Sequence, residues 1–129
     1  MSALVVMTTV GTEDEATRIA RELVCRRHAA CVNLVPGIKS LYRWQGKVCR
    51  DTEYLLMIKT LESEYPAVEA AIRELHSYEL PEILAFKCAH GEAGFVDWIA
   101  AALDKSAGGC RDDDDQYEDP PIPLDETNY

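Results

Sequence analysis

The sequence lacks the long apolar run that a membrane-spanning helix needs. No stretch of about 18 consecutive apolar residues occurs among the 129 residues, so we expect neither a membrane span nor a membrane partner. The first ten residues, MSALVVMTTV, have no basic segment and no small-residue cleavage pattern. They are therefore not typical of a signal peptide, and the apolar stretch 3–10 predicts a buried strand instead.

Closely spaced cysteine pairs are also missing. The five cysteines form no C-x-x-C motif, and their number is odd. This pattern favours reduced thiols over a disulfide framework and predicts a cytoplasmic location. The cysteines are Cys25, Cys31, Cys49, Cys88 and Cys110.

Short catalytic motifs are absent as well. The sequence contains no glycine-rich phosphate loop, no H-E-x-x-H and no G-x-S-x-G. These motifs form, respectively, a phosphate-binding loop, a zinc site with its general base, and the turn that carries a nucleophilic serine. We therefore expect that the protein is not an enzyme.

Positive charge is scarce and forms no stripe. The net charge is −10, and residues 107–129 alone hold eight acidic residues and one arginine. A nucleic-acid partner is therefore not expected, because nucleic-acid-binding proteins carry clustered basic side chains.

Residues 1–106 are predicted to form one domain, and residues 107–129 an acidic, disordered tail. The DDDD run at 112–115 lacks the alternating ligands and glycine of a calcium loop.

The residues that are present centre on a long hairpin over residues 30–60. Two runs rich in β-branched and aromatic residues flank a turn at Gln45-Gly46-Lys47, and apolar positions alternate as in strands. Pro36-Gly37 predicts a bulge or an open edge, because proline donates no ladder hydrogen bond. Each arm is far longer than the usual ~5–6 residues. We expect other copies of the chain to cover the overhang.

Helices are predicted on both sides of this hairpin. Thr12 and Glu15 have the spacing of a capping box, and helical spacing of apolar residues then continues to about residue 27. Pro66 lies in the first turn of a second helix, which ends at His76-Ser77. Residues 78–82 are a loop because Pro81 disfavours helix before it. A strand at 83–88 and a helix starting near Phe95 follow.

The predicted order is therefore βαββαβ plus a C-terminal helix. One antiparallel sheet with helices on one face satisfies the connections, which is the ferredoxin-like α+β plan. The other sheet face stays apolar and uncovered. Together with the long hairpin, it argues for a closed oligomer.

Four segments of the sequence resemble the CutA divalent-cation-tolerance family over roughly residues 4–103. These segments are ACVNLVPGIKSLYRWQGKV, EYLLMIKT, LHSYELPEILAF and VDWI. The family pattern has proline after the loop histidine, and here Ser77 takes that place. The resemblance implies a compact homotrimer, similar in architecture to PII signalling proteins, with hairpins that embrace neighbouring subunits. It also implies binding of copper or another divalent metal ion and a role in metal tolerance, without catalysis.

Cys31 and His76 match family positions suspected of metal ligation. A cysteine thiolate suits soft metals such as Cu(I), and a neutral imidazole is a common metal ligand. The alternatives are a small buried side chain for Cys31 and a helix-capping role for His76. The two residues are 45 positions apart and fit no recognised metal-binding spacing.

The loop residues Tyr78, Glu79 and Glu82 form a second candidate site. The resemblance places this loop near a neighbour's hairpin, so these residues, with Lys59 and Trp44, are expected at an inter-subunit cleft. The cleft would bind a small ligand or a protein partner, as in a PII-like signalling or scaffold module. The alternative is an interface that only holds the trimer, and aromatic residues such as Trp44 are common in interface cores.

Overall fold

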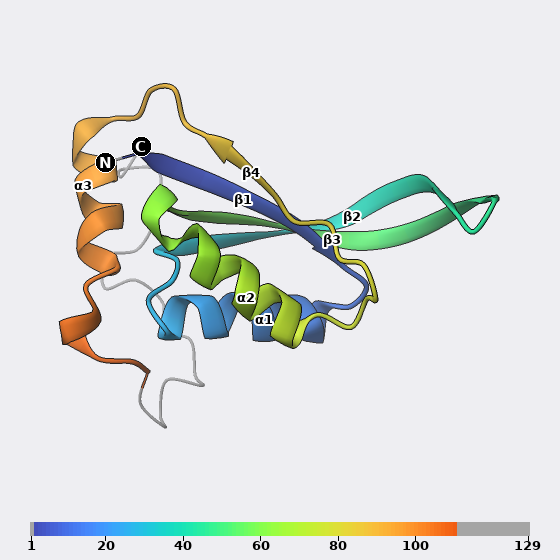
Figure 1. Cartoon of the computed structure of the whole chain (residues 1–129), viewed down its shortest axis with the longest axis horizontal. Helices are drawn as coiled ribbons and strands as arrows, with labels where there is room; N and C mark the ends of the chain where they lie inside the picture. The colour runs from blue at the N-terminus through green and yellow to red at the C-terminus, as the bar shows by residue number, and fades with distance from the viewer. Residues whose placement is uncertain (1, 111–129) are drawn as a thin grey trace, which may run out of the picture.

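The computed structural model describes residues 2–110. Most of the predicted tail, with its DDDD run, lies outside the described residues. A single sheet and three helices make up the described part (Figure 1). In chain order the elements are β1 (Ala3–Val10), α1 (Glu13–Cys25), β2 (Cys31–Trp44), β3 (Lys47–Leu61), η1 (Glu62–Glu64), α2 (Tyr65–Leu75), β4 (Leu84–Lys87), α3 (Ala93–Ala102) and η2 (Lys105–Ala107).

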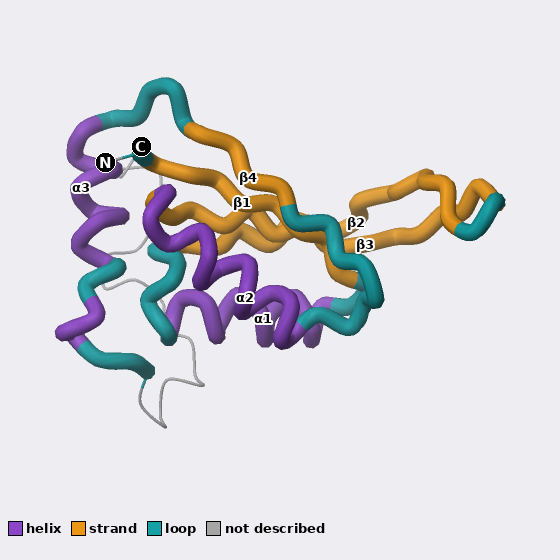
Figure 2. Tube along the Cα trace, in the orientation of Figure 1, coloured by secondary structure: helices purple, strands orange, loops and turns teal. Residues whose placement is uncertain are grey.

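The four strands form one antiparallel sheet in the order β2-β3-β1-β4. Helices α1 and α2 lie side by side across one face of this sheet, and α3 lies beyond one end of it (Figures 1 and 2). The element order and the antiparallel pairing confirm the ferredoxin-like α+β arrangement predicted from the sequence.

The core lies between the sheet and the first two helices. Every second residue of β1 is buried, beginning with Leu4 and Val6, as the two-residue period of a strand requires. From the helices, Ile19 and Leu23 of α1 and Ile72 of α2 join the same buried cluster. No helix among residues 2–110 is long and apolar enough to cross a membrane.

The hairpin of β2 and β3 extends well past the sheet. The pairing of β1 with β3 ends at Val10 and Tyr54, so residues 47–53 of β3 pair with β2 alone (Figure 1). Gln45 and Gly46 have φ angles of 49° and 78°, as expected for a two-residue hairpin turn of the I′ type. The register shifts between Val35 and Ile38, which confirms the predicted bulge.

The start of α1 corrects one expectation. Thr12 caps the helix as predicted, since its hydroxyl accepts from the Glu15 backbone N–H at 3.2 Å. The Glu15 carboxylate does not complete the capping box. It accepts instead from the Ser77 backbone N–H at 2.7 Å and from the Ser77 hydroxyl at 3.0 Å. The fold brings the end of α2 beside the start of α1, and this long-range partner replaces the local one.

The segment after α3 returns to the C-terminal end of α1. A disulfide joins Cys25 to Cys110, and the Arg27 guanidinium donates to the carbonyl oxygens of Gly108 and Ala102. The prediction of reduced thiols is therefore wrong for Cys25 and Cys110, which are 85 residues apart in sequence and meet only in the fold. The other three cysteines, Cys31, Cys49 and Cys88, are free.

Candidate functional site

A cavity of about 670 Å³ lies where the hairpin leaves the sheet. Its wall is formed by β2, β3, the end of β1 and the loop that follows α2. Acidic and aromatic side chains dominate the lining: Tyr42, Trp44, Asp51, Glu53, Tyr78 and Glu79 are among them. We call this the hairpin cavity.

The strand register places the hairpin residues on one face. Ser40 pairs with Asp51, and Ile38 pairs with Glu53. Because side chains two positions apart share a face of a strand, Asp51 and Glu53 lie on the same side as Tyr42. The Tyr42 hydroxyl donates to the Asp51 carboxylate, which is a diagonal contact between neighbouring strands.

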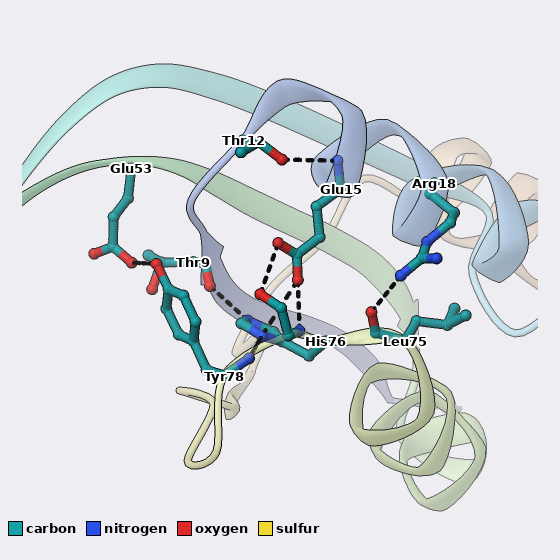
Figure 3. Close-up of polar contacts among 9 residues, drawn as sticks. Thr9, Thr12, Glu15, Arg18, Glu53, Leu75, His76 and Tyr78 are labelled. Atoms are coloured by element: carbon teal, nitrogen blue, oxygen red, sulfur yellow. Dashed lines mark hydrogen bonds and ion pairs between the residues drawn. The ribbon is translucent and has the colours of Figure 1, made fainter.

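The loop after α2 closes the cavity from the other side. The Tyr78 hydroxyl donates to Glu53 Oε2 at 2.9 Å, and the Tyr78 backbone N–H donates to His76 Nδ1 at 3.0 Å (Figure 3). The rings of His76 and Tyr78 also contact each other, with centroids 4.6 Å apart. The loop conformation therefore orients Tyr78 toward the buried carboxylate of Glu53.

The two tyrosines of the cavity are protonated at neutral pH. The hydrogen bond to Asp51 raises the pKa of Tyr42 to about 12, and burial together with Glu53 raises the pKa of Tyr78. Both phenols therefore donate to carboxylates and add no charge of their own. Among the lining residues that lie within 2–110, Lys39 is the single basic side chain against four acidic ones, namely Asp51, Glu53, Glu79 and Glu82.

His76 is buried, and both of its ring nitrogens have protein partners. Nε2 lies 2.7 Å from the Thr9 carbonyl oxygen and therefore donates, whereas Nδ1 accepts from the Tyr78 backbone N–H. The ring thus connects β1 to the loop, and the Glu15 carboxylate lies 3.6 Å from Nδ1 (Figure 3). A metal ion at either nitrogen would first have to displace one of these two partners.

Cys31 is the first residue of β2 and is partly exposed, with Lys59 opposite it on β3. Its thiol is free, as a metal ligand requires. Within residues 2–110, however, no three His, Cys, Asp or Glu side chains converge as a group able to hold a metal ion. The metal-ligand roles of Cys31 and His76 therefore remain predictions.

Four of the five predicted cleft residues lie together in one subunit. Trp44, Tyr78, Glu79 and Glu82 all line the hairpin cavity. Lys59 does not, because its ammonium group lies 5.9 Å from the ring centroid of Phe95 on α3. Its place in a cleft between subunits stays a prediction about the assembled protein.

The sequence analysis missed Asp51 and Glu53. Asp51 and Glu53 are two residues apart on β3 and pair with Ser40 and Ile38 on β2, so the face that they share with Tyr42 could be recognised only once the hairpin register was known. Glu53 was the harder of the two to find, because it is just 6% exposed and acidic residues are rarely buried without a partner.

Comparison with protein families gives one clear match. The model of the family described as CutA1 divalent ion tolerance protein matches residues 4–102. The divalent-cation tolerance protein CutA of Thermus thermophilus is 46% identical over 95 residues, which cover 74% of this chain and 92% of that protein. Protein CutA of Homo sapiens is 43% identical over 91 residues, covering 70% of this chain. The chain spans 51% of that human relative and 55% of a chloroplastic relative from rice.

Solved structures agree with this match. The Cut A1 structure from Thermus thermophilus superimposes with a TM-score of 0.74 at 45% identity, covering 75% of this chain and 94% of that one. The CutA1 structure from Oryza sativa gives 0.77 at 37% identity, covering 79% and 94%. Both similarities lie far above the level at which only the fold is shared.

Proposed function

Because the chain belongs to the family of CutA1 divalent ion tolerance proteins, we propose that it contributes to tolerance of copper or another divalent metal ion as a homotrimer. The proposed role is binding of the metal rather than catalysis. Assembly into a trimer and binding of the metal would depend on different residues.

The large exposed apolar surface supports self-association. Phe95 and Trp98 of α3, with ring centroids 5.5 Å apart, are 45% and 48% exposed. Leu84 and Phe86 of β4 are more than half exposed as well. Apolar side chains also line the overhanging hairpin, where Leu41 is 69% exposed. Surfaces of this kind mark protein interfaces, and an edge strand that carries them needs a cover.

Cys31 is the residue that supports metal binding best. Its thiol is free and partly exposed, and thiolates select soft ions such as Cu(I). His76 would join it only after giving up its contact with Thr9 or with Tyr78. Ligands supplied by more than one subunit would complete such a site.

Titration of the purified protein with Cu(I) and with Cu(II) tests the metal role. Cys31→Ser should weaken Cu(I) binding strongly, whereas Cys49→Ser, which changes another free and partly exposed cysteine, should leave it unchanged. His76→Ala tests the second ligand. Equal binding by the wild type and the Cys31→Ser variant would contradict the assignment of Cys31.

The hairpin cavity favours a second role, in which the protein is a PII-like signalling or scaffold module. The observation behind this role is a cavity of about 670 Å³, within the range of small-molecule sites, with a mostly buried carboxylate at Glu53. Metal binding would then be incidental. Ligand binding that is unchanged by Cys31→Ser would favour this role.

The compartment of the protein needs its own measurement. The expectation of a cytoplasmic location relied on reduced cysteines, and the bond between Cys25 and Cys110 weakens that argument because disulfides are rare in the cytosol. A relative from rice is named as chloroplastic. Microscopy of the tagged chain would decide the compartment.

A further inference from the structure

The lining of the hairpin cavity has a chemistry that selects for one class of ligand. Four carboxylates and one lysine leave the cavity strongly acidic. Tyr42, Trp44 and Tyr78 keep 40%, 40% and 36% of their surface exposed. Rings and acids together are the pattern of a site for organic cations, since aromatic faces attract positive charge.

Glu53 is the residue on which a ligand would be held. Its side chain lies in the cavity wall, and the residue is 6% exposed. Oε2 accepts from the Tyr78 hydroxyl, while Oε1 takes no hydrogen bond from the described residues. Figure 3 shows Oε1 directed away from Tyr78. A mostly buried carboxylate is screened less by salt than an exposed one, so this oxygen is a strong acceptor for an N–H donor or a cationic head group.

The aromatic side chains supply the other half of the site. Ser40, Tyr42 and Trp44 are each two residues apart on β2 and therefore share one face of the strand. Asp51 of β3 lies on that face as well, because it pairs with Ser40. The hydrogen bond to Asp51 fixes the Tyr42 ring. The apolar body of a ligand can therefore lie against the rings while its charge meets the carboxylates.

Two other ligand classes fit this cavity less well. An anion would meet four carboxylates and a single lysine. A metal ion needs several ligands at short distances, and no such group of acidic, cysteine or histidine side chains is present in residues 2–110. The acids surround the cavity rather than converge on one point, which suits a larger cation.

We propose that the hairpin cavity binds an organic ammonium ion that carries an apolar group, with the charge at Glu53 and Asp51 and the apolar group against Tyr42 and Trp44. This inference rests on the second role proposed above and adds the chemical class of the ligand. It does not depend on metal binding at Cys31.

A set of probes that differ only in charge tests this proposal. Benzylamine and benzyltrimethylammonium carry a positive charge, benzyl alcohol is neutral and benzoate is negative. We expect NMR titration of the side-chain N–H signal of Trp44 to show binding of both cations, and binding of benzyl alcohol and benzoate to be weaker by about tenfold or more.

Matched variants locate the charge recognition. Glu53→Gln keeps an acceptor for Tyr78 and removes the charge, so it should weaken binding of both cations by about tenfold and leave benzyl alcohol unaffected. Glu69→Gln removes an acid on α2 outside the cavity and should change nothing. Trp44→Leu, read by the remaining cavity signals, should weaken benzyltrimethylammonium binding by about threefold or more.

Different failures have different meanings. Benzoate or benzyl alcohol binding as tightly as benzylamine would overturn the cation proposal but leave a ligand cavity. A different outcome is that Zn²⁺ is the one ion that displaces benzylamine, with Zn²⁺ binding weakened in Glu53→Gln. That result would assign the carboxylates to a metal ion and overturn the cation proposal. If none of the four probes shifts the Trp44 signal, the cation proposal is contradicted, and the second role then rests on a protein partner. A changed sedimentation mass in Glu53→Gln would mean that a neighbouring subunit fills the cavity.

Discussion

The contact between Tyr42 and Asp51 stabilises the hairpin only while the phenol keeps its proton. The folded protein raises the pKa of Tyr42 from 10.0 to about 12, chiefly through the hydrogen bond to Asp51. A raised pKa means that the folded state holds the proton more tightly than the unfolded state. The contribution to stability is therefore complete below pH 10 and is lost as the pH rises toward about 12.

A titration of tyrosine ionisation tests this contact. The difference in phenolate absorbance between the wild type and Tyr42→Phe should show a midpoint near 12. In the Asp51→Asn variant the same midpoint should move down toward the ordinary tyrosine value, because the acceptor carboxylate is gone. An unchanged midpoint in Asp51→Asn would contradict the assigned cause.

Ser77 fixes the loop that orients Tyr78. Its backbone N–H and its hydroxyl both donate to Glu15, and the proline of the family pattern has no N–H to donate. Ser77→Ala should lower the free energy of unfolding by about 1 kcal/mol, because one solvent-exposed hydrogen bond is lost. Urea denaturation measures the change, and Ser63→Ala, at an exposed position in η1, serves as the control. Equal stability of the two variants would show that the serine hydroxyl contributes nothing.

The same residues show what sequence can and cannot predict. The cap at Thr12 depends on neighbours three positions apart, and its main hydrogen bond was predicted correctly. The partners of Glu15 and His76 are 62 and 67 residues away in the chain. No local pattern encodes such contacts, so the connecting role of His76 and the buried carboxylate of Glu53 required the structure.

At the level of elements, the hairpin was the most predictable part. Its alternation, its Pro36-Gly37 bulge and its Gln45-Gly46 turn are each local signals, and each corresponds to an observed feature. The contact of the C-terminal segment with α1 was not predictable. Arg27, Cys25 and Cys110 hold that segment, although composition assigned residues 107–110 to a tail.

Counting thiols tests this attachment. Under denaturing, non-reducing conditions the wild type should expose three reactive thiols, those of Cys31, Cys49 and Cys88. Cys110→Ser should expose one more, from Cys25, and its unfolding temperature should fall because a link across 85 residues is lost. Reduced wild-type protein is the control and should expose all five cysteines. Five reactive thiols without a reducing agent would mean that the bond does not form in solution.

The assembly of the protein depends on what covers its exposed apolar residues. Trp98→Asp would put a charge on the surface that α3 offers to a neighbour, and burying an unpaired charge is costly. We expect this variant to dissociate at concentrations where the wild type stays assembled, as measured by sedimentation velocity. Asp97→Ala, at the exposed adjacent position, should sediment like the wild type. A Trp98→Asp variant that also stays assembled would remove α3 from the interface.

The mass of the purified wild-type protein in solution shows whether the chain assembles as a trimer. Sedimentation equilibrium at micromolar concentration should give three times the chain mass of 14.4 kDa, with no mass change over a wide dilution range. A stable, well-folded species at 14.4 kDa would contradict the proposed trimer, because a single chain would then tolerate its exposed hairpin, β4 and α3 without a partner.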